Sequence, residues 1–217
     1  MPFSGIIFDL DGTLADTLAD IGDSMNRVLA ANKFPYHPLE DYKLLVGKGL
    51  DNLVMQSLPV HARQTAIVAR CLSQFIEDYT LNCVVKTCLY KGIKELLGEL
   101  TAHNLKLAVF SNKAEPLTIK IIDHLLPEIP FVRVMGARPD FPKKPDPAGA
   151  LFISEQMGIN PENLLYLGDS DVDMITASRA GMYAVGVLWG FRTSKELTVN
   201  GAMKLLHHPL DLLEILA

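Results

Sequence analysis

From residue 92 to residue 187 the sequence alternates between segments with the apolar period of a helix and short continuous apolar runs. The apolar runs cover residues 105–110, 131–135, 164–167 and 183–187, and the helical segments cover 92–101, 116–126, 147–157 and 171–180. Short uninterrupted apolar runs are typical of strands that are buried on both faces, and helices between them form β-α-β units. This half of the chain therefore predicts a doubly wound α/β fold, in which helices cover both faces of a parallel sheet.

The N-terminal part departs from that alternation in a way that indicates an insertion. Residues 5–8 form another apolar run, but the pattern then stays helical until about Thr80, with a break at residues 46–49 and no further strand. We therefore expect residues 1–14 and 86–217 to form the α/β core. Residues 15–85 are expected to form a helical domain inserted after the first strand, and a last helix is expected over residues 210–216.

Composition excludes several classes of protein. The chain has 20 Lys and Arg against 25 Asp and Glu, a net charge of −5, so it offers no basic field for nucleic acid. No apolar run approaches the roughly 18–20 residues that span a bilayer, and Asp9 interrupts the first apolar stretch, which argues against a signal peptide. The sparse cysteines Cys71, Cys83 and Cys88 suggest reduced thiols. We expect a cytoplasmic protein without nucleic-acid or membrane partners, either a monomer or a small homo-oligomer.

Polar residues gather where three of the predicted strands end. Asp9-Leu10-Asp11-Gly12 follows the first strand, Ser111-Asn112-Lys113 follows the second, and Gly168-Asp169-Ser170-Asp171-Val172-Asp173 follows the fourth. A further cluster, Lys143-Lys144-Pro145-Asp146, precedes the helix at 147–157. Ligands of open parallel sheets bind outside the carboxyl ends of the strands. We therefore expect all four clusters to share one edge of the sheet.

The acidic residues among them favour a metal site. Asp9 and Asp11 are two positions apart, so extended backbone would point both carboxylates to one side, where they repel each other unless a cation or a proton intervenes. Asp169 could supply a third carboxylate, and Asp173, one helical turn later, could approach the same ion directly or through water. Hard oxygen ligands of this kind suit Mg²⁺. The alternative is that Asp9 and Asp11 only cap the following helix.

Other residues provide donors for an anion. Ser111, Asn112 and Lys144 offer a hydroxyl, an amide and an ammonium group, all of which can donate hydrogen bonds to phosphate oxygens. Lys48 lies between Gly47 and Gly49 in the break of the helical insert, and we expect it to contact the part of a substrate beyond the phosphate. A plain turn with an exposed lysine is the alternative there.

In this order, the four clusters resemble the four motifs of the haloacid dehalogenase-like hydrolases. Residues 46–49 and 187–191 further resemble the phosphoglycolate phosphatase-like branch of that family. The resemblance implies a Rossmann-like core with a mobile helical cap. It also implies a Mg²⁺-dependent hydrolase of phosphoric monoesters that acts on a small phosphorylated metabolite, with 2-phosphoglycolate as the leading candidate.

The resemblance also implies roles for single residues. Asp9 would be the nucleophile that forms an aspartyl phosphate, and Asp11 the general acid that protonates the leaving oxygen and then activates water. Ser111 and Lys144 would hold the transferring phosphoryl group. A carboxylate that attacks a phosphate dianion meets like-charge repulsion, which Mg²⁺ and Lys144 would offset.

In the same way, Mg²⁺ would be held by Asp9, the backbone carbonyl of Asp11 and Asp169, with Asp173 in support. Two other functions remain open. A sugar phosphomutase of the β-phosphoglucomutase type would use the same four motifs, and a non-catalytic phosphate-binding module would share the phosphate donors but would need no nucleophile.

Overall fold

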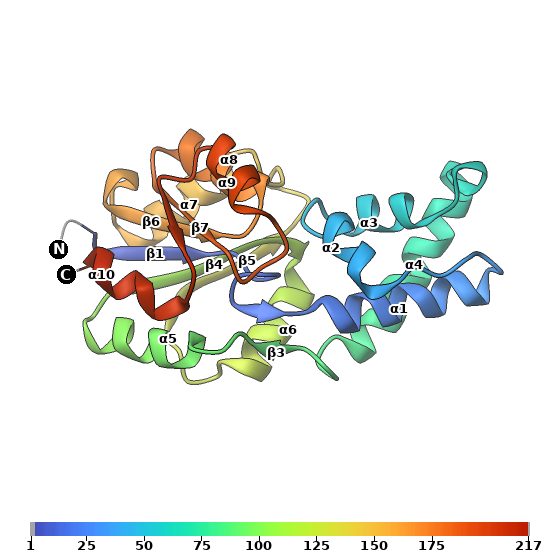
Figure 1. The fold of residues 1–217 in the computed structure, drawn as a ribbon, viewed down its shortest axis with the longest axis horizontal. Coiled ribbons are helices and arrows are strands. Elements are labelled where there is room, and N and C mark those ends of the chain that lie inside the picture. Colours follow the sequence, from blue (N-terminus) through green and yellow to red (C-terminus); the bar gives the residue numbers. More distant parts are fainter. Residues whose placement is uncertain (1–2, 217) are drawn as a thin grey trace.

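The computed structural model describes residues 3–216, so Met1, Pro2 and Ala217 of the predicted core lie outside the described residues. Its centre is a six-stranded sheet in the order β5-β4-β1-β6-β7-β8, with every neighbouring pair parallel (Figure 1). The strands are β1 (Gly5–Phe8), β4 (Lys106–Ala114), β5 (Phe131–Ala137), β6 (Leu164–Gly168), β7 (Tyr183–Val187) and β8 (Lys204–Leu206). The first strand of the chain thus lies in the middle of the sheet, between β4 and β6.

Helices cover both faces of this sheet, as the alternation predicted. Ile6 and Phe8 point to one face, which packs against α5 (Ile93–Ala102), α6 (Glu115–Leu125) and α10 (Leu212–Leu216). Ile7 points to the other face, which packs against α7 (Ala148–Met157), α8 (Asp171–Ala180) and α9 (Ser194–Val199). Figure 1 shows these two layers below and above the sheet. The expected doubly wound α/β fold is therefore confirmed.

The segment between β1 and α5 is helical and lies beside the sheet (Figure 1). It contains α1 (Leu18–Ala31), α2 (Tyr42–Leu45), α3 (Leu50–Ser57) and α4 (Thr65–Asn82). We call residues 15–85 the cap; its boundaries stay a prediction. Two short strands, β2 (Ala15–Asp16) and β3 (Cys88–Leu89), pair antiparallel next to those boundaries. Both crossings between cap and core therefore run side by side.

Some elements differ from the sequence prediction. Strand β4 runs on to Ala114, so Ser111, Asn112 and Lys113 lie within its last residues rather than after it. Strand β8 and helix α9 were not expected, and the last helix begins with a 3-10 turn at Pro209–Asp211. Within residues 3–216, none of the helices is both long and apolar enough to cross a membrane.

Candidate active site

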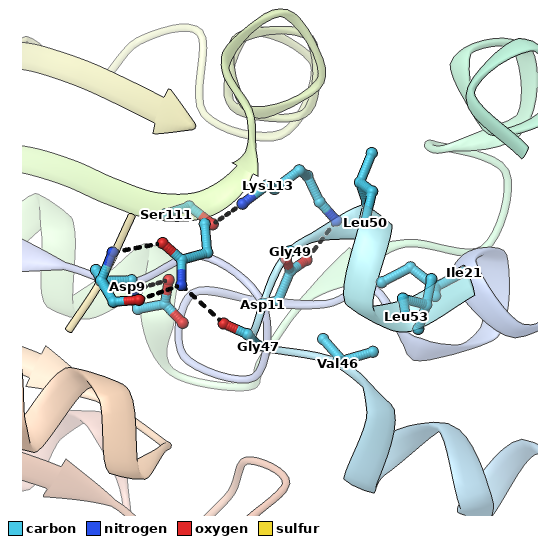
Figure 2. A pocket seen from close by; sticks show the side chains of 12 residues that line it. Asp9, Asp11, Ile21, Val46, Gly47, Gly49, Leu50, Leu53, Ser111 and Lys113 are labelled. Carbon is cyan, nitrogen blue, oxygen red and sulfur yellow. Dashed lines mark hydrogen bonds and ion pairs between the residues drawn. The ribbon is translucent and has the colours of Figure 1, made fainter. Parts of the chain in front are cut away.

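The four polar clusters meet at one edge of the sheet, as predicted. Asp9 follows β1, Ser111 lies near the end of β4 and Asp169 follows β6, and these three strands are neighbours. Lys144 reaches the same place from the loop between β5 and α7. All of the predicted site residues of the core are buried, with exposed fractions from 0% for Asp173 to 9% for Asp11. Between them and the cap lies a cavity that encloses about 390 Å³, including its open mouth (Figure 2).

Lys144 connects Asp9 with Asp173. Its ammonium group donates hydrogen bonds to Asp9 Oδ1 at 2.8 Å, to Asp173 Oδ1 at 2.6 Å and to the carbonyl of Phe110 at 3.1 Å. Asn112 fixes the backbone of Lys144: its Oδ1 accepts from the Lys144 N–H at 2.8 Å, and its Nδ2 donates to the Lys144 carbonyl at 3.0 Å. Each of the three N–H donors of the ammonium group thus has an acceptor that the fold holds in place.

The charges of these groups are strongly linked. Burial by itself lowers the pKa of Lys144, but Asp173 and Asp9 raise it well above its ordinary value, so the side chain stays charged. Burial, together with the neighbouring Asp173, raises the pKa of Asp9 to about 7. Burial, Asp173 and Asp9 likewise raise the pKa of Asp169 well above its ordinary value. Asp9 and Asp169 therefore hold their protons more strongly than free carboxyl groups do.

Three of the aspartates form a compact cluster that could hold a cation. Carboxylate oxygens of Asp9, Asp169 and Asp173 lie within 4.8 Å of one another. The backbone N–H of Phe191 donates to Asp169 Oδ2 at 2.7 Å, and the N–H and hydroxyl of Ser170 donate to Asp173 Oδ2 at 3.1 and 2.5 Å. Four buried aspartates in this site face two buried lysines, so a divalent cation would balance the charge. The hard oxygen donors fit Mg²⁺.

Two glycines allow the backbone to approach Asp169. Gly12 has φ +85°, and a Cβ atom there would lie 2.2 Å from Asp169 Oδ2. A Cβ atom at Gly190, in the loop after β7, would lie 2.4 Å from both Asp169 Cβ and the carbonyl oxygen of Gly12. Larger residues at either position would displace the carboxylate from the cluster.

Comparisons with known proteins agree with this geometry. The model of the family described as "Haloacid dehalogenase-like hydrolase" matches residues 6–187. The chain belongs to the haloacid dehalogenase-like hydrolases. It is 32% identical over 195 residues to a phosphoglycolate phosphatase of Rhodospirillum rubrum, covering 86% of this chain and 80% of that one. It is 30% identical over 196 residues to a phosphoglycolate phosphatase of Pseudomonas putida, covering 88% and 72%.

The fold of this chain agrees with the crystal structure of a protein from Lactobacillus delbrueckii subsp. bulgaricus. The TM-score is 0.93 at 27% identity, and the match covers 99% of this chain and 98% of that one. This haloacid dehalogenase-like hydrolase is a phosphatase of the phosphoglycolate phosphatase-like branch. The expected family, fold and enzyme class are thereby confirmed, whereas the roles of the single site residues stay predictions.

Asp11, the predicted acid and base of this hydrolase, is held by two donors on one oxygen. Asp11 Oδ1 accepts hydrogen bonds from the hydroxyl of Thr17 at 2.5 Å and from the ammonium group of Lys113 at 2.6 Å. Lys113 also donates to the Tyr79 hydroxyl at 2.8 Å, from helix α4 of the cap. Burial alone lowers the pKa of Lys113, but Asp11 and Tyr79 raise it above its ordinary value.

Sequence reasoning assigned no role to Lys113, although it stood within the second motif. A signal was present: Ser111 and Lys113 are two residues apart, and residues at that spacing on a strand point to the same face. The structure places Lys113 in the cavity lining together with Ser111. A prediction in which the strand continues through residues 111–113, rather than ending at residue 110, would have placed these two side chains on the same face.

Lys48 of the hydrolase is exposed, unlike the predicted site residues of the core. Its side chain is 56% exposed and its ammonium group lies 3.8 Å from Asp171 Oδ2. The adjacent Gly47 and Gly49 line the cavity, and Asn112 Nδ2 donates to the Gly47 carbonyl at 3.0 Å. The loop thus reaches the site through its backbone, and a substrate-binding role for Lys48 stays a prediction.

Proposed function

We propose that this hydrolase is a Mg²⁺-dependent phosphatase that releases phosphate from a small phosphomonoester, with 2-phosphoglycolate as the leading candidate. The observation that carries the proposal is the arrangement around Asp9. A buried carboxylate, an ammonium group at 2.8 Å and a cluster of two further carboxylates are what phosphoryl transfer to an aspartate requires.

In the first step, a carboxylate oxygen of Asp9 attacks phosphorus, and the bond from phosphorus to the leaving oxygen breaks. The product is an aspartyl phosphate. In the second step, water attacks phosphorus, and the bond from phosphorus to Asp9 breaks, so that phosphate leaves and the carboxylate is restored. Lys144 and the hydroxyl of Ser111 hold the phosphoryl oxygens, so that positive charge and a donor meet the charge that spreads over them. Division of one difficult displacement into two easier ones is the benefit of the covalent step.

Asp9, Asp169 and the backbone carbonyl of Asp11 would hold Mg²⁺, with Asp173 in support. When bound, the ion supplies charge compensation for the phosphoryl oxygens. Asp173 has a second task here, because its Oδ1 accepts from Lys144 at 2.6 Å and so orients the ammonium group. The backbone N–H of Phe191 holds the Asp169 carboxylate in place by donating a hydrogen bond to its Oδ2.

Asp11 donates a proton to the leaving oxygen in the first step and accepts one from water in the second. Thr17 and Lys113 both bind Oδ1, so the plane of the carboxyl group is fixed and Oδ2 remains for proton transfer. The cap contributes apolar side chains from Ile21, Leu50 and Leu53 to the cavity, which exclude water from the reacting groups.

The test is phosphate release from a panel of small phosphomonoesters that includes 2-phosphoglycolate, with and without Mg²⁺. Asp9→Asn is expected to abolish release, because an amide cannot attack phosphorus. Asp16→Asn is the matched control, since Asp16 is exposed and asparagine can still accept a hydrogen bond from the Leu18 N–H, as Asp16 does at 3.2 Å.

Release that needs neither Mg²⁺ nor Asp9 would contradict the proposal. Interconversion of sugar phosphates without phosphate release would instead identify a phosphomutase. Tight phosphate binding without turnover would identify a binding module. A cytoplasmic location, and a monomeric or small homo-oligomeric state, remain predictions.

A further inference from the structure

The cavity has two chemically different ends. Figure 2 shows Asp9 at one side and the cap residues Ile21, Leu50 and Leu53 at the other, with Asp11 between them. Because the phosphoryl group must reach Asp9, the remainder of the substrate extends past Asp11 toward the cap. The cap side of the lining is apolar, with Val46 joining these three side chains, and Gly47 and Gly49 contribute only backbone.

Only two cations line the cavity in the part of the chain that the structure describes: Lys144 and Lys113. The three donors of Lys144 are engaged by Asp9, Asp173 and Phe110 at the phosphoryl end. The ammonium group of Lys113 donates to Asp11 and to Tyr79, and an ammonium group has three donors. Lys113 thus keeps one donor beside the path of the leaving group.

The position of this ammonium group is fixed by its partners. Tyr79 is fully buried and stacks on Phe75, with the ring centroids 5.3 Å apart. Lys113 itself is 3% exposed, and its ammonium group also lies 4.9 Å from the centre of the Tyr79 ring. A cation that is held in place before the substrate arrives binds an anion without the cost of ordering a flexible side chain.

We propose that Lys113 is the specificity-determining residue of this site, and that it binds a carboxylate at the far end of a short phosphorylated hydroxy acid. The inference rests on the proposed function. A carboxylate that enters an apolar chamber loses its hydration, which is costly unless a cation and a hydrogen bond replace it. Lys113 supplies both, whereas the exposed Lys48 and Lys143 lie outside this lining.

The test compares kcat/KM for 2-phosphoglycolate with kcat/KM for its neutral amide, phosphoglycolamide, which has the same number of heavy atoms. The wild-type protein is expected to prefer the acid by about 10–100-fold, the effect of one charged hydrogen bond. Lys113→Gln keeps a donor for Asp11 but removes the charge, and it is expected to bring the ratio close to one. Lys113→Arg is expected to retain most of the preference.

The ratio separates specificity from catalysis. Any damage to Asp11 lowers turnover of both substrates alike and cancels in the ratio within one variant. Tyr79→Phe, which leaves the charge but removes one partner of the ammonium group, should lower the ratio about two- to five-fold. Lys94→Met, on the exposed surface of α5, is the charge-matched control and should leave the ratio unchanged.

An unchanged ratio in Lys113→Gln, or its collapse in Lys48→Met instead, would overturn the assignment to Lys113 while the proposed function stands. A wild-type protein that turns over acid and amide equally would also overturn it. Release from neither substrate, with Mg²⁺ present and the protein folded, would overturn the assignment, and release from none of the phosphomonoesters of the panel would contradict the proposed function itself.

Discussion

The carboxylate of Asp20, in the first turn of α1, accepts a hydrogen bond from the backbone N–H of Thr87 at 2.8 Å. The N–H groups of Val85 and Lys86 donate to the same carboxylate at 3.0 and 2.9 Å. Asp20 is 3% exposed, so these bonds are shielded from water. One side chain of α1 thereby fixes the segment that leads out of the cap and into β3.

Asp20→Asn is expected to lower the free energy of unfolding by about 1.5–3 kcal/mol, because hydrogen bonds to a charged acceptor are lost and the amide donors face backbone N–H groups. Asp23→Asn is the matched control. Asp23 lies one turn further along α1 and pairs with Lys86 Nζ at 2.6 Å, but both side chains are more than 40% exposed. It should cost less than about 1 kcal/mol. Equal shifts of the two variants in urea unfolding would contradict this role of Asp20.

Lys144→Met is expected to reduce kcat by about 100-fold or more, because it removes a cation from the developing phosphoryl charge. It also leaves Asp9 and Asp173 without their shared partner, so a loss of about 3–5 kcal/mol in stability should accompany it. Lys143→Met should change kcat little, since Lys143 is 41% exposed and pairs with Asp51 of the cap. Steady-state kinetics and thermal unfolding measure the two effects, and a fully active Lys144→Met would rule out the proposed role.

Gly190→Ala is expected to weaken metal binding and turnover at least tenfold, because the new methyl group would lie 2.4 Å from the Cβ atom of Asp169. Gly98→Ala provides the contrast: this glycine lies within α5 and a Cβ atom there would meet nothing within 4 Å. That substitution should stabilise the protein by about 0.5–1 kcal/mol. The Mg²⁺ concentration needed for half-maximal phosphate release is the measurement, and equal values in both variants would contradict the prediction.

Mg²⁺ is expected to raise the melting temperature more at about pH 8 than at about pH 5.5. Burial and Asp173 raise the pKa of Asp9 from 3.8 to about 7. Because the folded-state value lies above the unfolded one, the stabilisation from this carboxyl is complete below about pH 4 and is lost as the pH rises through about 7. The metal competes with the same proton, so its benefit grows over that range.

Thermal unfolding at both pH values, with and without Mg²⁺, tests this dependence. Asp169→Asn removes a predicted ligand and should abolish most of the metal-dependent shift at either pH. A shift of equal size at both pH values in the wild-type protein would show that the metal does not displace a proton from the cluster.

Local signals explain what could be predicted from the sequence. The five longer strands are apolar runs that need no knowledge of their partners, and Asp9, Ser111 and Asp169 were identified because each directly follows or ends such a run. The ends of parallel strands share an edge, so their convergence followed from topology. The shorter strands β2, β3 and β8 have two or three residues each, and pairing with distant segments, rather than local pattern, makes them strands.

The contacts of single side chains could not be predicted, because they join residues that lie far apart along the chain. Lys113 meets Asp11 across 102 positions and Tyr79 across 34, and Asp20 meets Thr87 across 67. No local pattern indicates which way a lysine on a buried strand turns, or which backbone N–H groups an aspartate on a helix accepts from. The same is true of Lys48, whose side chain lies beside Asp171.

The pairing of β2 with β3 also bears on how such a protein can change over evolutionary time. Ala15 lies opposite Leu89 and Asp16 opposite Cys88, so the chain leaves the core and returns to it at adjacent positions. The cap is therefore joined to the core through two neighbouring segments, β2 and β3, which hold each other in place. A different helical segment can be exchanged between the same two anchors without altering the register of β1 with β4 and β6. The side chains that the cap contributes to the cavity can therefore change while Asp9, Lys113 and Lys144 of the core keep their places.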